Sequence, residues 1–293
     1  MRPPMALTLA GTDPSGGAGV HADLKTFTAR KTCGTSVITA LVAQNTHGVA
    51  AVLPVPADFV RAQFASVFDD LPVDATKSGM LGSRALVELV LDERRRRDFG
   101  HFTLDPVMVA TSGHRLLDAD AVTLLRSELL PVADLVTPNL PEAALLLGDQ
   151  VAPATSPAEM HRQARELVAR GAGAVLLKGG HGTGGEVLDV LVSARGLEAE
   201  FRHPRIASAN THGTGCTLSA AITADLATLR HARGGAGVDD AMLHRAVSGA
   251  LDYLARAIAA AAGWQFSRIA AGAHGPVDHQ VDIPLSPTLA GTP

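Results

Sequence analysis

Short apolar runs alternate with amphipathic segments along most of the chain. Six runs rich in alanine, valine and leucine are typical of buried strands: Ala6–Ala10, Ser36–Ala43, Ala75–Ser78, His101–Asp105, Asp134–Thr137 and Ala174–Lys178. Between most of them lie segments with helical periodicity: Ala22–Ala29, Asp58–Phe68, Ser83–Arg97, Ala119–Leu130, Pro141–Leu147 and Pro157–Arg170. This alternation predicts an α/β fold with a central, mostly parallel sheet and helices on both faces.

The last third of the chain has a different pattern. Val187–Ser193 and Leu197–Phe201 flank a short turn that contains Gly196, which predicts a β-hairpin. From Gly213 onward we expect two long helices separated at Gly234–Gly237, and the proline-containing tail after Gly275 favours a poorly ordered end. No repeat and no linker interrupts the pattern. We therefore predict one domain over residues 1–293, with an ordered core from about residue 5 to about residue 280.

Composition narrows the class of protein. Hydrophobic residues make up 46% of the chain and aromatic residues only 3%, so a large core must be built from small aliphatic side chains. A net charge of −4 does not favour nucleic-acid binding, and no apolar stretch approaches the roughly 18 residues of a membrane span. Cys33 and Cys216 are too few for a disulfide scaffold and suit a reducing compartment, so we expect a cytoplasmic protein.

The run from Asn210 to Ser219 is the most informative segment for chemistry. Its glycines lead into an alanine-rich helical stretch, which predicts a helix start around Gly213 to Cys216. Such a start offers free backbone N–H groups and the positive end of a helix dipole, and it binds anions, above all phosphate. A plain helix cap is the alternative. Cys216 would stand over the anion, or it would be a small buried residue that packs the helix start.

Other polar and glycine-rich clusters follow the predicted strands, and ligands of α/β sheets bind beyond the carboxyl ends of strands. The loop Gly11–Gly19 resembles a phosphate loop but lacks the Gly-Lys-Ser/Thr ending, so ligand contact and an ordinary tight turn both stay open. Lys178 ends an apolar strand, where a charge is costly unless it meets an anion such as a nucleotide phosphate.

Asn139 and Glu142 lie three residues apart at a helix start, with Pro141 in the first turn. This spacing fits a capping box. It also fits a water-mediated Mg²⁺ site, because Mg²⁺ binds few protein carboxylates and keeps several waters. Asp105, at the end of another strand, would be a second carboxylate near the metal.

Several segments, in order along the chain, resemble one family. They are Ala10–Gly19 with Ala22–Thr26, Thr39–Thr46, Asp105–Met108, Thr137–Glu142, Lys178–His181, Thr211–Thr217 and Gly272–Val277. Together they are very similar to the motifs of hydroxymethylpyrimidine/phosphomethylpyrimidine kinases. The resemblance implies the ribokinase-like fold, ATP and Mg²⁺ as cofactors, a homodimer, and two successive phosphoryl transfers in thiamine diphosphate synthesis. The first converts 4-amino-5-hydroxymethyl-2-methylpyrimidine to its monophosphate, and the second converts that to the diphosphate.

The same resemblance implies roles for individual residues. Gln44 would hold the aminopyrimidine through an amide that both donates and accepts. The implied pocket walls are Gly11, Asp23, Met80 and Val107, although Asp23 could instead be a surface residue of its helix. The implied nucleotide contacts are Asn139, Lys178, Thr211 and Gly213. The implied metal ligands are Asp105 and Glu142, and the implied catalytic groups are Cys216, Gly213, Gly215 and Lys178.

Cys216 stands where many sugar kinases of this fold have an aspartate base. Our hypothesis is that the first acceptor, an alcohol, gains from a base, whereas the second is a phosphate that a fixed carboxylate would repel. Because a helix N-terminus lowers the pKa of a thiol, we expect a thiolate to be available for the alcohol. The alternatives are a pyridoxal kinase of the same fold and a non-catalytic ligand-binding module. We also predict a mobile flap at the glycine-rich loop 182–185.

Overall fold

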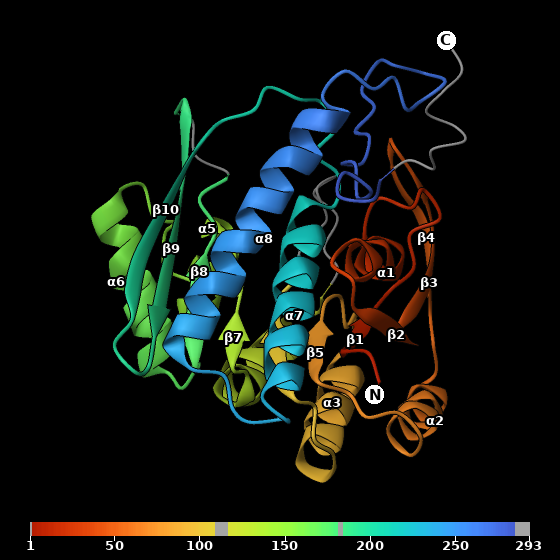
Figure 1. Ribbon diagram of the computed structural model, residues 1–293, viewed down its shortest axis with the longest axis vertical. Coiled ribbons are helices and arrows are strands. Elements are labelled where there is room, and N and C mark those ends of the chain that lie inside the picture. The colour runs from red at the N-terminus through yellow and green to blue at the C-terminus, as the bar shows by residue number, and fades with distance from the viewer. Residues whose placement is uncertain (1, 109–116, 181–183, 285–293) are drawn as a thin grey trace.

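The computed structural model describes residues 2–108, 117–180 and 184–284. Its centre is an eight-stranded sheet with the order β10-β9-β8-β7-β6-β5-β1-β2 (Figure 1). The strands from β8 to β2 are parallel to one another, and the β9–β10 hairpin joins that sheet antiparallel at β8. The strands are β1 (Met5–Ala10), β2 (Cys33–Ile38), β5 (Ala75–Ser78), β6 (His101–Leu104), β7 (Leu135–Val136), β8 (Ala174–Leu177), β9 (Glu186–Ser193) and β10 (Glu198–Pro204).

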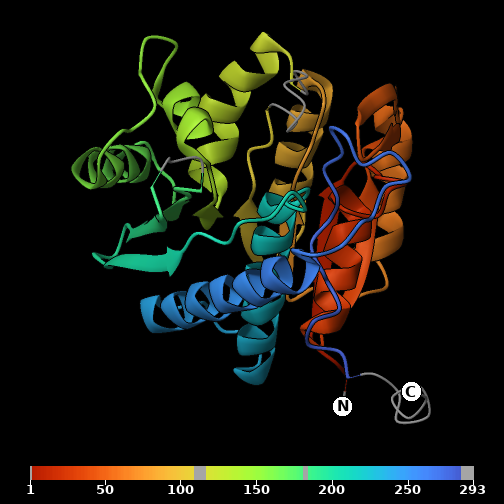
Figure 2. The ribbon, with the colours of Figure 1, turned by 90° about the horizontal axis from the view of Figure 1, so that it is seen from above.

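Helices cover both faces of this sheet, as the alternating pattern predicted (Figure 2). One face carries α1 (Gly19–Ala29), α7 (Thr214–Ala232) and α8 (Asp240–Ala261). The opposite face carries α2 (Ala57–Phe68), α3 (Arg84–Arg96), α4 (Ala119–Leu124), α5 (Leu140–Leu147) and α6 (Pro157–Ala169). The expected small-residue packing is confirmed where alanines of α7 meet alanines of β1 and β5 in one buried cluster. This close approach brings the start of α7 to the edge of the sheet.

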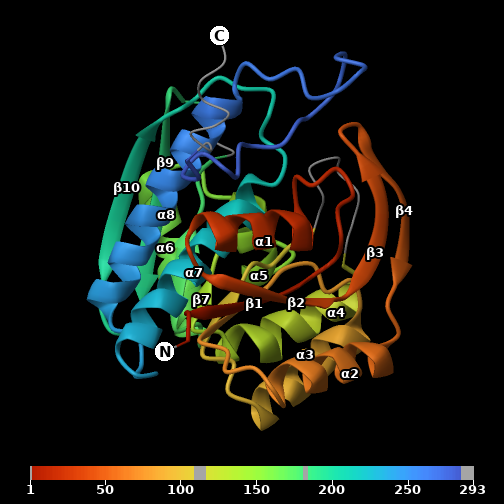
Figure 3. The ribbon, with the colours of Figure 1, turned by 45° about the vertical axis from the view of Figure 1, so that its right-hand side comes forward.

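The strand predicted over Ser36–Ala43 is wrong as a single element. The chain leaves the main sheet at Thr39, whose backbone N–H donates to Ala10 and whose hydroxyl donates to the Met80 carbonyl. Beyond this point β3 (Ala40–Asn45) pairs antiparallel with β4 (Gly48–Pro54), which the sequence pattern did not reveal (Figure 3). The resulting two-stranded sheet is separate from the main sheet and lies beside its β2 edge.

The predicted helix Ala119–Leu130 is also more irregular than expected. Regular α-helix ends with α4 at Leu124, a π-helical turn follows over Leu125–Leu129, and a short 3₁₀ turn covers Leu130–Val132. Pro131 contributes to this change because it has no amide hydrogen for a helical bond. By contrast, the hairpin and the two long C-terminal helices are confirmed, with Gly234 and Gly235 at positive φ between α7 and α8.

The expectation of a poorly ordered end after Gly275 is wrong for residues 276–284. Val277 and His279 are buried, Pro276 forms a bridge with His212, and the Tyr253 hydroxyl donates to the His279 carbonyl. This segment packs over the start of α7 because Thr217 hydrogen-bonds the His279 ring. Within the described ranges, every helix is too short or too polar to span a bilayer.

Candidate active site

The sheet brings most of the predicted site residues to one edge. Because β1, β5, β6, β7 and β8 are parallel, the segments that follow them emerge on the same side. An isolated parallel bridge between Asn139 and Lys178 extends the β7–β8 pairing into this region. The start of α7 approaches the same edge, since a Cβ added to Gly215 would lie 3.3 Å from Lys178 Nζ.

The start of α7 has the form of an anion-binding turn. Gly213 is the residue before the first turn and has a left-handed φ of 79°, and no side chain caps the helix. A Cβ on Gly213 would lie 1.8 Å from the Gly17 carbonyl oxygen, so only glycine fits this backbone contact. No side-chain cap therefore competes with an anion for the N–H groups of Gly215 and Cys216 in this first turn. Thr211 supports the turn through its carbonyl, which accepts from the Thr214 N–H at 3.4 Å.

Lys178 and Asp105 form an ion pair at this edge. Lys178 Nζ lies 3.1 Å from Asp105 Oδ1, and the lysine side chain keeps 13% of its surface exposed. Ser219 and Thr137 also donate to the Asp105 carboxylate, at 3.0 and 3.2 Å. Burial alone would lower the pKa of Lys178, but Asp105 and Glu142 outweigh it and hold that pKa above its ordinary value. A charged lysine therefore stands beside the anion-binding turn.

Asn139 and Glu142 form the capping box that the spacing allowed. The Asn139 side chain accepts from the Glu142 N–H at 2.8 Å, and Glu142 Oε2 accepts from the Asn139 N–H at 2.8 Å. The arrangement leaves Glu142 nearly buried. Burial raises the pKa of Glu142 to about 7, with Lys178 opposing and Asp105 adding to the shift.

The two carboxylates suit a hard divalent cation. Asp105 and Glu142 are both buried and act on each other electrostatically, so a cation between or beside them would relieve the cost of charging Glu142. Carboxylate oxygens are the ligands that Mg²⁺ prefers, with waters and substrate phosphates completing its shell. The residues present therefore fit Mg²⁺, and their role as ligands remains a prediction.

Four of the predicted substrate-binding residues lie close to elements of this edge. Gly11 faces Met80, because a Cβ added to Gly11 would lie 2.6 Å from Met80 Cε. Gln44, on β3, has its amide nitrogen 3.3 Å from His212 Nε2, next to the anion-binding turn. Val107 is half-buried directly beyond Asp105 and donates its N–H to that residue's carbonyl. The structure thus connects Gln44, through His212, to the start of α7.

Sequence reasoning missed the pairing of Asp13 with His212. His212 Nε2 lies 2.8 Å from Asp13 Oδ2, and the same carboxylate accepts the N–H groups of Gly17 and Ala18. Burial would raise the pKa of Asp13, but the bonds from His212 and Ser15 lower it well below its ordinary value. Asp13 therefore fixes the Gly11–Gly19 loop against the α7 start. An acidic residue within a glycine-rich loop is the signal that could have identified it.

Asp23 does not line an open pocket as predicted, and it is not a surface residue either. Its side chain is fully buried, with Asp23 Oδ1 2.5 Å from Lys77 Nζ. Asp23 lies on the face of α1 that packs against the sheet, and its carboxylate pairs there with Lys77 of β5. Lys77 was missed, although a lysine within the apolar strand Ala75–Ser78 needs a buried partner for the same reason as Lys178.

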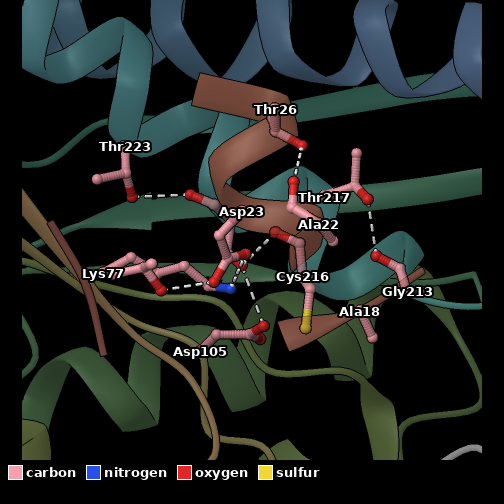
Figure 4. Close-up of polar contacts among 12 residues, drawn as sticks. Ala18, Ala22, Asp23, Thr26, Lys77, Asp105, Gly213, Cys216, Thr217 and Thr223 are labelled. Atoms are coloured by element: carbon pink, nitrogen blue, oxygen red, sulfur yellow. Dashed lines mark hydrogen bonds and ion pairs between the residues drawn. The ribbon is translucent and has the colours of Figure 1, made fainter. Parts of the chain in front are cut away.

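The expected thiolate at Cys216 is also corrected. Burial raises the pKa of the Cys216 thiol to about 11, and it outweighs the opposing effects of Lys77 and of the Gly19 N–H. The thiol of the free protein is therefore neutral near pH 7. Figure 4 shows Cys216 projecting from the first turn of α7, with Asp105, Asp23 and Lys77 grouped nearby. In the predicted flap at 182–185, residues 182 and 183 lie outside the described residues.

The fold and this edge together define a small-molecule kinase of the ribokinase-like class. The family model for phosphomethylpyrimidine kinase matches residues 13–278, and the chain belongs to this family. A hydroxymethylpyrimidine/phosphomethylpyrimidine kinase from Escherichia coli (strain K12) is 55% identical over 220 residues, which cover 75% of this chain and 81% of that protein.

Two solved structures extend the comparison. The crystal structure of phosphomethylpyrimidine kinase from Clostridium difficile 630 has a TM-score of 0.73 at 36% identity, covering 87% of this chain and 99% of that one. The pyridoxal kinase from Staphylococcus aureus in complex with ADP has a TM-score of 0.82 at 30% identity, covering 96% and 95%. Family membership thus establishes the class of enzyme, while fold similarity extends to kinases that act on another substrate.

Proposed function

We propose that the protein transfers a phosphoryl group from ATP to 4-amino-5-hydroxymethyl-2-methylpyrimidine, and a second one to the resulting monophosphate. The observation that carries this proposal is the uncapped start of α7 with Lys178 beside it. An anion-binding turn and a charged lysine at one sheet edge match the needs of phosphoryl transfer, which depends on alignment and charge neutralisation. The family's curated relatives support the choice of substrate.

The residues divide the work as follows. Backbone N–H groups from Gly213 to Cys216 stabilise charge on the group in transfer, and Lys178 leaves Asp105 to meet the ATP phosphates. Gln44, with Gly11, Met80 and Val107, holds the pyrimidine ring so that its hydroxymethyl group faces the turn. Asn139 and Thr211 contact the nucleotide. Asp105 and Glu142 would hold Mg²⁺, which would supply further neutralisation of phosphate charge.

The direct test is ATP consumption with purified protein and each candidate acceptor. We expect ADP release with the pyrimidine alcohol and with its monophosphate, in the presence of Mg²⁺, at rates far above the rate without acceptor. The matched variant is Gly213→Ala, whose added Cβ cannot coexist with the Gly17 carbonyl. Binding of the pyrimidine without ADP release would contradict the proposal and favour a non-catalytic ligand-binding module.

Pyridoxal kinase is a second candidate, because the S. aureus pyridoxal kinase is similar over 96% of this chain. Pyridoxal also presents a hydroxymethyl group on a heterocycle. Comparing kcat/KM for pyridoxal with that for the pyrimidine alcohol separates the two functions. A clear preference for pyridoxal would overturn the assignment of Gln44 to an aminopyrimidine.

We further propose a homodimer and a cytoplasmic location for this single kinase domain. The β3–β4 sheet supports the dimer, since it exposes Leu41 and Leu53, and Phe59 of α2 is also exposed. Burial of such side chains between two copies is a common source of affinity. The exposed free thiol of Cys33 suits a reducing cytoplasm. Light scattering of the wild type and of Leu53→Lys tests the dimer, which the substitution should weaken.

A further inference from the structure

A second lysine lies behind the thiol, and the steps above do not use it. Lys77 on β5 and Asp23 on α1 are both fully buried, with Nζ 2.5 Å from Oδ1. Thr8 donates to the other carboxylate oxygen of Asp23. A buried ion pair carries a desolvation cost that packed apolar side chains of the same volume avoid. Its presence next to a reaction centre therefore calls for a reason other than stability.

The side chain of Cys216 lies beside this pair at the first turn of α7 (Figure 4). The Lys77 ammonium favours the charged form of the sulfur, and the Asp23 carboxylate opposes it. Lys77 Nζ also lies 3.7 Å from the position of a Cβ on Gly79, so it sits directly under the turn that leads to Met80. Burial would lower the pKa of Lys77, but Asp23 and Asp105 outweigh it and keep that pKa above its ordinary value.

The other charges around Cys216 come from separate elements. Asp105 follows β6 and Lys178 follows β8, and both act on the thiol electrostatically. Lys178 is partly exposed beside Asp105, so phosphates of a nucleotide can engage it. Lys77 has no exposed surface and cannot turn outward to a ligand. Its charge stays fixed behind the thiol through both transfers.

We propose that Lys77, held by Asp23, is a positioning residue that stabilises negative charge on Cys216 Sγ during transfer to the alcohol. This inference rests on the proposed function and adds a residue to it. The monophosphate is already an anion and needs no base, so the second transfer does not require a charged sulfur. The first transfer therefore depends on Lys77 and the second does not, although both use the same turn and the same nucleotide.

The step balances as follows. Cys216 first releases its proton to solvent, at a cost that Lys77 reduces. The alcohol oxygen then bonds to the γ-phosphorus of ATP while its proton passes to Cys216 Sγ. The bond between that phosphorus and the β,γ-bridging oxygen breaks, and ADP leaves with the electron pair. The products are the monophosphate, ADP and a neutral thiol.

The test compares two double variants, one that neutralises the Lys77–Asp23 pair and one that neutralises a matched ion pair elsewhere in the protein. Lys77→Met/Asp23→Asn removes both charges and keeps similar side-chain volumes. The control is Arg30→Met/Asp225→Asn, which removes an ion pair between the end of α1 and α7, away from the thiol. Both are made in a Cys33→Ser background, because Cys33 is an exposed free thiol that would also react.

Two readouts are measured for each variant. The first is the rate of Cys216 alkylation by iodoacetamide between pH 7 and pH 9.5, which rises with pH because only the thiolate reacts. The second is the ratio of kcat for the alcohol to kcat for its monophosphate. For the neutral pair we expect about tenfold slower alkylation at a given pH, which corresponds to one pKa unit. The kcat ratio should fall by about tenfold or more, and the control should change neither.

A third variant keeps the proposal testable if the neutral pair does not fold. Asp23→Asn alone removes the carboxylate that opposes charge on the thiol, while Asp105 still favours the charged form of Lys77, so alkylation should become faster, the opposite sign to the neutral pair. Unchanged alkylation, or an equal fall in both transfers, would overturn the role of Lys77. Because alkylation needs no substrate, failure of the proposed function would appear separately, as absent turnover of the wild type with both pyrimidines.

Discussion

Two lysine–aspartate pairs flank the start of α7, and they differ in exposure more than in chemistry. Lys77 and Asp23 are 2.5 Å apart and fully buried. Lys178 and Asp105 are 3.1 Å apart, and the lysine keeps 13% of its side-chain surface exposed. The buried Lys77–Asp23 pair, called here the sealed pair, can act on its surroundings only through its electric field. In the partly exposed Lys178–Asp105 pair, called here the open pair, the lysine can exchange its aspartate for a ligand. On the proposed function, the buried pair tunes the charge of the site and the partly exposed pair binds the nucleotide.

The environment of each aspartate supports this distinction. Asp105 accepts hydroxyl groups from Ser219 and Thr137, so it stays hydrogen-bonded if Lys178 moves to a phosphate. Asp23 has one hydroxyl donor, from Thr8, and depends on Lys77 for its charge balance. Removing the lysine should therefore have different consequences in the two pairs.

The largest expected effect is on stability, from Lys77→Met. The substitution leaves the Asp23 carboxylate buried without a cation, which costs about 3–5 kcal/mol of unfolding free energy. Urea unfolding followed by circular dichroism measures this loss. The same measurement on Arg30→Met, in a pair with both side chains partly exposed, should show a smaller loss. A change below about 1 kcal/mol for Lys77→Met would mean that the pair is not sealed as described.

The next effect is on activity, from Lys178→Met. Loss of this cation from the transfer site should lower kcat by about 10²–10³, as removal of one group that stabilises transition-state charge does. Steady-state ADP release measures it. Lys31→Met removes an equal charge from the turn after α1 and serves as the control. Activity within threefold of wild type in Lys178→Met would show that the open pair does not meet the nucleotide.

Nucleotide binding gives a third, smaller difference between the pairs. ADP at about one hundred times its dissociation constant should stabilise the wild type by about 2.7 kcal/mol. Lys77→Met/Asp23→Asn should keep most of this stabilisation, because its open pair is intact, and Lys178→Met at the same ADP concentration should lose most of it. Thermal unfolding with and without ADP measures the effect. Equal stabilisation of all three proteins would show that the two pairs do not differ in their contribution to nucleotide binding.

The smallest effect is expected when both charges of the sealed pair are removed together. Lys77→Met/Asp23→Asn leaves no unpaired charge, so its unfolding free energy should lie within about 1 kcal/mol of the wild type. The double-mutant cycle with the two single variants then isolates the coupling between the side chains. Losses that simply add would contradict a direct ion pair.

The two lysines also illustrate how far the sequence predicts the site. Lys178 ends an apolar strand next to glycines, and its place at the ligand edge followed from parallel-strand geometry. Lys77 lies inside a strand, where the direction of its side chain depends on which helix covers that face. In the structure α1 supplies the buried partner on that face, Asp23, and no local pattern around Lys77 contains this contact.

Other differences have a similar origin in tertiary contacts. The break at Thr39 depends on bonds to Ala10 and Met80, which no local pattern contains. The neutral thiol at Cys216 depends on burial, which opposes the helix-terminus effect that sequence reasoning relied on. By contrast, the layers, the mostly parallel sheet and the capping box at Asn139 are encoded by local spacing, and the structure matches them.

The contact between Gly213 and the Gly17 carbonyl has a consequence for synthesis of the protein. It joins two turns that are nearly two hundred residues apart in the chain, and such non-local contacts form late because a long loop must close first. A nascent chain on the ribosome can assemble β1, β5 and β6 early, but it can form the turn at Gly213 only once α7 has emerged. The enzyme is therefore inert through most of its translation.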